Sequence, residues 1–194
     1  LPGFWLTAGL AFFGTFACLP HLGVRMQEFG MLFLAAELFI LDIADRRRKA
    51  VLLLILPPFF WLWASMHGSW PLGIGIAFIW IIIKAFERRF DRRQILGILS
   101  LIILSAAATL LTPYGLELYS FLYGYGDDFY MKVIQEWLPQ WNFPYNYTQS
   151  IYIALSLLLG GSYFFRVYKK EEKLDGWQAF LFFLLLPMAS RSPP

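Results

Sequence analysis

Residues 61–75, WLWASMHGSWPLGIG, decide the fold, because one apolar segment ends there at His67 and Gly68 and the next begins at Pro71. Gly and Pro mark tight turns, so the stretch predicts two membrane helices joined by a short hairpin. Three tryptophans flank the bend. A histidine placed where helices leave the bilayer can bind phosphate, transfer a proton or cap a helix.

The composition is typical of a membrane protein. The 194 residues are 59% hydrophobic, 20% aromatic and only 15% charged, which is well above the apolar share of a soluble domain. Apolar segments near the length that crosses a bilayer recur between short charged loops. This pattern predicts an all-α polytopic transmembrane bundle that forms a single domain over residues 1–194. Because the chain starts inside one apolar segment and stops just after another, we interpret it as a fragment of a longer protein.

Seven membrane spans are expected. They cover residues 4–19, 27–43, 51–66, 71–86, 95–112, 149–168 and 177–189. The segment between the fifth and sixth spans, 113–148, holds twelve aromatic residues, and amphipathic rings favour the membrane interface. We therefore expect short interfacial helices in this long outer loop.

Basic residues lie almost entirely in alternate loops. Four follow the second span, five lie at or after the end of the fourth, and four lie at or after the end of the sixth, which makes 13 of the 16 Lys and Arg residues. The positive-inside rule therefore places these loops and the N-terminus in the cytoplasm. The His67 hairpin and the 113–148 loop are then expected on the outer side.

Charged residues in and beside the second span are candidates for function. Glu37 lies near the middle of that span, where a carboxylate is costly to bury. It either makes a proton or substrate contact, or is protonated and bonds to a neighbouring helix. Arg25 and Glu28 flank the outer end of the span and either neutralise each other, or Arg25 binds a phosphate through a bidentate contact.

Aromatic and polar groups on the outer side are further candidates for substrate binding. Beside His67, the ring of Trp70 offers a face for a sugar or a prenyl chain, and the alternative is a purely interfacial turn with aromatic anchors. Tyr114 lies in the TPYG turn that ends the fifth span. Glu136 and Trp137 are adjacent, and a carboxylate beside an exposed aromatic ring is a common way to hold a saccharide.

Several classes of site are excluded or unsupported. The sequence contains no P-loop, dinucleotide fingerprint, HExxH helix or nucleophile elbow. The single cysteine, Cys18, excludes an internal disulfide and a cysteine-based metal centre. We expect no metal and no cofactor. The net charge of +3 does not indicate nucleic-acid binding, because the basic residues adjoin the membrane spans.

Five features together resemble a group of uncharacterised bacterial multi-spanning proteins. They are Arg25 before an apolar span, LWASMHGSWPLG at 62–73, TPYG at 112–115, EWLP at 136–139 and the closing MASRS. These proteins are similar to the membrane half of type C glycosyltransferases, which take sugar from a polyprenyl-phosphate carrier on the outer face. The resemblance implies a location in the bacterial inner membrane.

The chain departs from that pattern in two respects. Ser65, Ser69 and Thr112 stand where Asn, Gly and Asn are usual. The catalytic acid of type C glycosyltransferases lies in the first outer loop, whereas this chain has no acid there before Glu28. Either the catalytic acid lies outside this fragment, with Glu28 and Glu136 as the alternatives within it, or the protein never had that activity.

Two functions follow as hypotheses. In the first, the chain is part of a glycosyltransferase-like protein that handles a polyprenyl-phosphate-linked sugar at the outer leaflet, with Arg25 on the carrier phosphate and His67 and Glu136 on the sugar or acceptor. In the second, it is a non-catalytic scaffold or accessory subunit that binds membrane lipid and other protein subunits of a complex. Transport, in which Glu37 would take part, is a third alternative.

Overall fold

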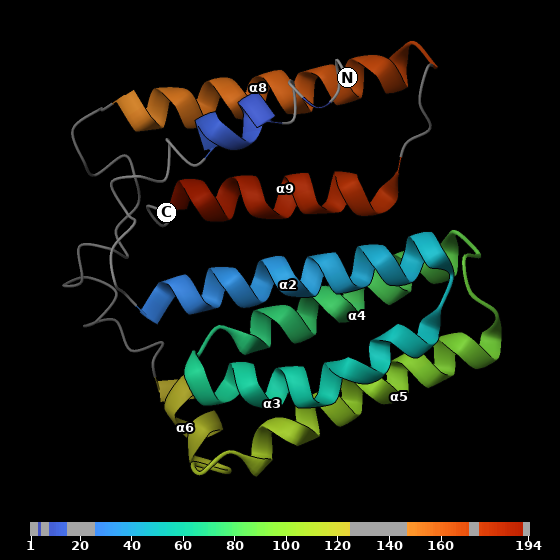
Figure 1. Cartoon of the computed structure of the whole chain (residues 1–194), viewed down its shortest axis with the longest axis vertical. Coiled ribbons are helices and arrows are strands. Elements are labelled where there is room, and N and C mark those ends of the chain that lie inside the picture. Colours follow the sequence, from blue (N-terminus) through green and yellow to red (C-terminus); the bar gives the residue numbers. More distant parts are fainter. Residues whose placement is uncertain (1–3, 5–7, 15–25, 125–146, 171–174, 192–194) are drawn as a thin grey trace. The chain divides into compact units, whose positions relative to one another are not determined.

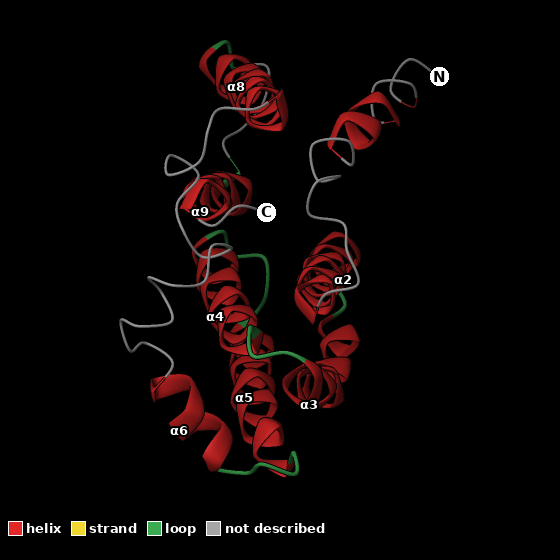
Figure 2. Ribbon diagram, turned by 90° about the vertical axis from the view of Figure 1, so that its left-hand side faces the viewer, coloured by secondary structure: helices red, strands yellow, loops and turns green. Residues whose placement is uncertain are grey.

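The computed structural model describes residues 4, 8–14, 26–124, 147–170 and 175–191, and within these ranges it contains helices and turns and no strand (Figures 1 and 2). The prediction of an all-α protein is confirmed. The chain divides into two compact units. One, here called the central unit, is Val24–Gly126, and the other, the terminal unit, combines Leu1–Gly23 with Asp127–Pro194. The prediction of a single domain stays a prediction.

The central unit is built from four long helices that alternate in direction (Figure 1). In chain order its elements are α2 (Met26–Arg47), η2 (Ala50–Ile55), α3 (Leu56–Met66), α4 (Trp70–Phe86), α5 (Arg92–Ala108), η3 (Thr109–Leu111) and α6 (Glu117–Gly124). Helix α5 packs against α3 and α4, and α2 packs against the same two helices. This alternation places both basic loops of the unit at one end and the His67 turn at the other (Figure 1).

Local sequence explains where these helices begin. Pro71 lies in the first turn of α4, where its missing N–H has no helical partner to lose. Helix α5 begins at a capping box: the Asp91 carboxylate accepts a hydrogen bond from the Gln94 backbone N–H at 2.8 Å, and the Gln94 side chain accepts one from the Asp91 N–H at 3.0 Å. A proline in the first turn of α4 and a capping box at α5 therefore set the start of these two helices.

Three helices end at a basic residue with left-handed backbone geometry. Arg48 follows α2 with φ 50°, Arg88 follows α4 with φ 53°, and Lys170 follows α8 (Tyr147–Tyr168) with φ 60°. After α2, the N–H groups of Arg48 and Lys49 donate to carbonyls three and five residues earlier, and the same two bonds close α4. This is the Schellman pattern, in which glycine is the usual left-handed residue. Here the position carries a positive charge instead.

The core of the central unit forms around one buried stripe of α2. Its members recur at helical spacing and are Gly30, Phe33, Glu37, Leu41 and Ala44. The indole of Trp63 stacks between two rings, at 5.6 Å and 14° from Phe33 and at 5.5 Å and 13° from Phe60. Trp63 has no exposed surface, so it fixes α2 against α3 at the centre of the packing.

Gly73 is required where α4 meets this stripe. A Cβ atom at residue 73 would lie 2.5 Å from the Trp63 ring and 2.7 Å from Glu37 Oε2, whereas one at Gly75 would have no neighbour within 4 Å.

Gly73→Ala is expected to lower the free energy of unfolding by about 1–3 kcal/mol through overpacking. Gly75→Ala is the matched control and should raise it by about 1 kcal/mol through helix propensity. Thermal or denaturant unfolding in detergent measures both, and two changes of the same sign would contradict the packing.

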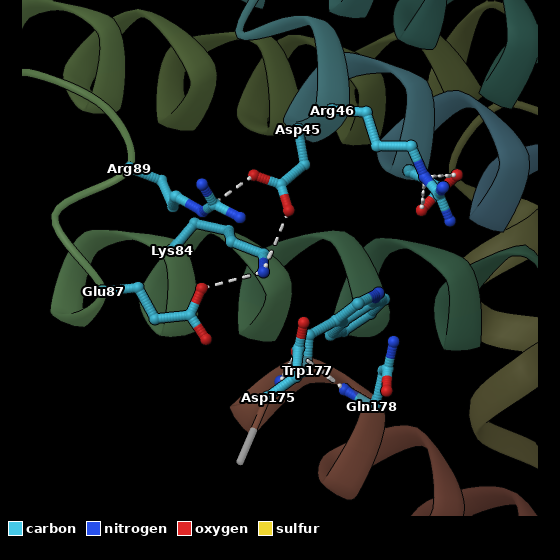
Figure 3. Close-up of polar contacts among 9 residues, drawn as sticks. Asp45, Arg46, Lys84, Glu87, Arg89, Asp175, Trp177 and Gln178 are labelled. Carbon is cyan, nitrogen blue, oxygen red and sulfur yellow. Dashed lines mark hydrogen bonds and ion pairs between the residues drawn. The ribbon is translucent and has the colours of Figure 1, made fainter. Parts of the chain in front are cut away.

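A buried ion cluster joins α2 to α4 at the basic end of the unit (Figure 3). The ammonium of Lys84 lies 3.1 Å from Asp45 Oδ2 and 2.8 Å from Glu87 Oε2, and Arg89 Nε lies 3.5 Å from Asp45 Oδ1. The Lys84 side chain is 1% exposed and that of Asp45 is 14% exposed. The loops that follow α2 and α4 are therefore linked by charge as well as by packing.

One helix is long and apolar enough to cross a membrane among the described residues. It is Arg92–Leu111, with a mean hydropathy of 2.2. Ala50–Met66, Trp70–Phe86 and Ile153–Tyr168 are apolar but shorter, and 17 residues of helix extend only about 25 Å against a hydrocarbon core of about 30 Å. The structure thus supports one span by length and composition and does not support the predicted seven.

The terminal unit contains α8 and α9 (Gly176–Arg191), together with a short helical segment at 8–14. Helices α8 and α9 pack through Phe164, whose ring lies 5.8 Å from Phe182 and 5.7 Å from Phe183. The Asp175 carboxylate caps α9 by accepting hydrogen bonds from the backbone N–H groups of Trp177 and Gln178 at 2.9 and 3.1 Å (Figure 3). This cap fixes the start of the last helix.

Candidate binding site at the His67 turn

A chain of hydrogen bonds links three side chains at the turn between α3 and α4. The indole N–H of Trp63 donates to Ser69 Oγ at 3.1 Å, and Ser69 Oγ lies 2.8 Å from His67 Nδ1. The backbone N–H of Ser69 also donates to His67 Nδ1, at 3.1 Å. Because an N–H can only donate, Nδ1 must be the unprotonated ring nitrogen and the Ser69 hydroxyl must donate to it. His67 is therefore the neutral Nε2–H tautomer.

The ends of two helices hold this cluster in place. Helix α3 ends at Met66, and its C-cap is His67, whose backbone is extended and whose N–H donates to the Trp63 carbonyl at 2.8 Å. Ser69 is the N-cap residue of α4, yet its hydroxyl makes no capping bond, because it is used in the cluster instead. A Cβ at Gly30 of α2 would lie 2.8 Å from His67 Nδ1 and 2.9 Å from Ser69 Oγ. The absence of a side chain at Gly30 lets α2 close over the turn.

A small pocket lies beside the cluster and is partly open to the surface. Its volume is about 170 Å³, and it is lined by Gly30, Met31, Leu34, Trp63, His67, Ser69 and Leu72. Its walls are almost entirely apolar, although His67 and Ser69 border it. Pockets that enclose a whole small ligand are usually about 300–1,000 Å³. This one can therefore take an alkyl or isoprenoid segment, or one edge of a larger ligand, but not a complete lipid-linked sugar.

The surroundings of His67 oppose its protonation. Partial burial lowers the pKa of the imidazole below its usual value. A proton on Nδ1 would in addition face two groups that donate to that atom. The cluster therefore favours the neutral ring, with Nε2–H as a hydrogen-bond donor and Nδ1 already occupied.

This lowered pKa predicts that acid destabilises the protein through His67. In the unfolded chain His67 takes up its proton at about pH 6.5, and in the folded state only at lower pH. Between those two values the unfolded state binds more protons, so stability falls as the pH drops below about 6.5 and is unaffected by this group above it. The fall in melting temperature between pH 7.5 and pH 5 should be smaller in His67→Gln than in the wild type. His21→Gln, which removes the other histidine, is the control, and an equal fall in the wild type and His67→Gln would contradict the prediction.

The structure places Trp70 away from this pocket. Its side chain is 4% exposed, and its ring packs edge-on against Tyr119 of α6 with centroids 5.2 Å apart. The Tyr119 hydroxyl lies 2.6 Å from Thr109 Oγ1 and donates to the Ala106 carbonyl at 3.0 Å, which holds α6 against the end of α5 (Figure 2). The face of Trp70 is thus used in packing, and Trp63 is the tryptophan that borders the pocket.

The other predicted site residues do not line this pocket or lie outside the described residues. Tyr114 is 62% exposed in the turn before α6 and does not line the pocket. Glu28 lies in the first turn of α2, where a negative charge interacts favourably with the helix dipole. Arg25, Glu136 and Trp137 lie outside the described residues, so their roles stay predictions.

Glu37 is fully buried in the middle of α2. Neither of its carboxylate oxygens has a hydrogen-bond partner among the described residues.

The sequence indicated Glu37 as a candidate but did not indicate Ser69 and Gly30, which build the His67 cluster. The spacing of His67 and Ser69 could have indicated the role of Ser69, because a hydroxyl two residues from a histidine can reach its ring. The sequence carries no comparable signal for Gly30, whose role depends on the packing of α2.

Comparison with protein-family models, with curated proteins and with solved structures finds no match to this chain.

Proposed function

We propose that this chain is part of an integral membrane protein, resembling the membrane half of type C glycosyltransferases, that handles a polyprenyl-phosphate-linked sugar. The observation that supports the proposal is the His67–Ser69–Trp63 cluster at the edge of an apolar pocket. Apolar walls suit an isoprenoid segment, and the Nε2–H of His67 is a donor for a phosphate or sugar oxygen. The small volume of the pocket requires the rest of the ligand to lie outside it.

The remaining predicted residues complete this proposal. Arg25 would contact the carrier phosphate, and Glu136 and Trp137 the sugar or acceptor, with Tyr114 at the same end of the helices as His67. The catalytic acid would come from Glu28, Glu136 or a part of the protein beyond this chain. No cofactor or metal is included in the proposal.

The proposed membrane arrangement has seven spans, with the basic loops in the cytoplasm and the His67 turn on the outer face of the bacterial inner membrane. Both basic loops of the central unit lie at one end of its helices and the His67 turn at the other, which supports this orientation for the unit (Figure 1). The shorter helices would span with the help of aromatic residues at their ends or of a locally thinned bilayer.

Single substitutions test the site. Arg25→Ala, His67→Ala and Glu136→Ala should each reduce transfer of sugar from a polyprenyl-phosphate donor in isolated membranes by tenfold or more, because each removes a polar contact to the ligand. Ser100→Ala, on an exposed position of α5, is the control and should retain wild-type transfer. Wild-type transfer in all three variants, at matched protein levels, would refute the proposed site.

A second candidate function is a scaffold or accessory subunit of a membrane complex. The observation in its favour is the apolar exposed surface of α5 and its continuation, where Ile103 is 71% exposed and Leu111 is 77% exposed. Such a surface can face lipid or another protein. Native mass spectrometry of the protein extracted in mild detergent distinguishes the two functions. A defined complex that Ile103→Ser dissociates supports the scaffold, and a single chain with bound lipid supports the first proposal.

A further inference from the structure

Glu37 is the buried acidic group that the proposed binding site does not use. It lies at the centre of the packed stripe of α2, with Phe33 and Leu41 one turn away on either side. Its side chain is 0% exposed, and both carboxylate oxygens lack a hydrogen-bond partner within the described part of the chain. Buried polar groups without partners are rare and require an explanation.

In the part of the chain that the structure describes, no cation pairs with Glu37. Its Oε2 atom faces Gly73 of α4, and the indole of Trp63 covers the same glycine. The buried cation on α4 is Lys84, which lies about 16 Å further along that helix from Gly73 and is bonded to Asp45 and Glu87. At the opposite end of the same packing seam the titratable group is His67, whose surroundings favour the neutral ring.

These surroundings determine the charge on the carboxyl group. An ionised carboxylate without a partner in an apolar interior costs several kcal/mol or more, so the group stays neutral and keeps its proton. A bound metal ion would need further oxygen ligands, and no cluster of three or more His, Cys, Asp or Glu residues exists among the described residues. The proton is therefore the ion that this site fits.

Two residues that line the pocket at the His67 turn, Leu34 and Trp63, also lie near Glu37. Leu34 lies one helical turn from Glu37 on α2 and lines the pocket, and Trp63 lines the pocket and also contacts the Gly73 position that Glu37 faces. One turn of helix is about 5 Å. Small movements of Leu34 and of the Trp63 ring would therefore connect the carboxyl group with water in the pocket.

We propose that Glu37 is a proton-binding site of the protein and that it exchanges its proton with water through the His67 pocket. In each exchange the carboxyl O–H bond breaks, the proton passes to a water molecule in the pocket, and the reverse step restores the neutral acid. The site binds a proton whether or not the protein also transfers sugar.

Infrared spectroscopy of the full chain in a detergent without ester or carboxyl groups tests the proposal. The carbonyl band of a protonated carboxylic acid should be present at neutral pH, should be absent from Glu37→Gln, and should shift within minutes of transfer to D2O. Glu37→Gln is neutral and nearly the same size, so we expect it to fold as the wild type does. Absence of the band from the wild type, or its survival in Glu37→Gln, would show that Glu37 is not a neutral acid and would overturn the proposal.

The route of exchange is tested with a pair of leucine variants on α2. Leu34→Phe enlarges the side chain between the pocket and Glu37 and should slow the D2O shift of the band at least tenfold. Leu32→Phe is the matched control, because Leu32 is 62% exposed, and should exchange at the wild-type rate. Equal rates in the two variants would exclude the pocket as the route, and a band that never shifts would exclude proton exchange altogether. Unfolding curves verify that both variants are folded.

Discussion

Replacing Lys84 by methionine is expected to lower the free energy of unfolding of the central unit by about 3–5 kcal/mol. Lys84 is buried between Asp45 and Glu87, and methionine has a similar length but no charge. The substitution leaves the Asp45 carboxylate, which is 14% exposed, with the long 3.5 Å contact to Arg89. Most of the cost arises because the Asp45 carboxylate stays largely buried without a close cation, and less of it is the lost attraction between Lys84 and Asp45.

The control for this prediction is a surface ion pair on the same end of α2. Arg46 contacts Asp42 at 2.7 Å, but the two side chains are 76% and 45% exposed. Arg46→Met should therefore lower the free energy of unfolding far less than Lys84→Met does, because an exposed pair is well solvated. Denaturant unfolding of the purified protein in detergent measures both variants. An effect of Lys84→Met as small as that of Arg46→Met would mean that Lys84 is not buried in the folded protein.

Replacing Trp63 by alanine is expected to cost a similar amount, about 3–5 kcal/mol. The substitution removes a fully buried ring that stacks between Phe33 and Phe60, and it leaves a cavity that two stacked rings cannot fill without moving. It also removes the N–H that donates to Ser69, so the His67 cluster loses one of its bonds. Both the packing of α2 against α3 and the shape of the pocket should change.

Two further tryptophan variants separate these contributions. Trp61 is 42% exposed and makes one long bond to the Leu111 carbonyl at 3.4 Å, so Trp61→Ala should cost about 1 kcal/mol. Trp63→Phe keeps most of the ring and removes the N–H, and its cost should lie between those of the two alanine variants. Unfolding free energies for the three variants provide the comparison. Equal costs for Trp61→Ala and Trp63→Ala would contradict the buried position of Trp63.

The positions of the central helices could be predicted from the sequence wherever apolar residues stop at a turn. The two helices and the short turn at 61–75 are confirmed, because α3 ends at Met66 and α4 begins at Trp70, whereas their place in a membrane stays a prediction. Agreement is poorer where a helix continues into charged residues. The second span was predicted to end at residue 43, whereas α2 continues to Arg47, since the pair formed by Asp42 and Arg46 stabilises the last turn. The length of an apolar segment therefore predicts which part of a helix could lie in a bilayer, but it does not predict where the helix begins or ends.

The candidate site was predicted only in part for a related reason. His67 could be identified because an unusual residue in a short turn is visible in the sequence. The burial of Trp70 depends on Tyr119, and the closure of the pocket depends on Gly30, and both contacts join segments far apart in the chain. Lys84 was counted as a basic residue of the loop after α4. Its spacing from Trp80 and Ile81, which are buried on the same face of α4, indicates that it belongs to the core.

The basic residues at the ends of α2, α4 and α8 have a consequence for how the protein tolerates mutation. Glycine at Arg48, Arg88 or Lys170 would relax a left-handed backbone by about 1 kcal/mol, but would also remove a charge. In the proposed orientation, that charge is part of the signal by which the insertion machinery decides which loop stays in the cytoplasm. Selection for heat resistance alone would favour glycine at these sites and would erode the fidelity of insertion. In the proposed orientation, the strained helix ends are therefore retained because their charges direct insertion in the correct topology.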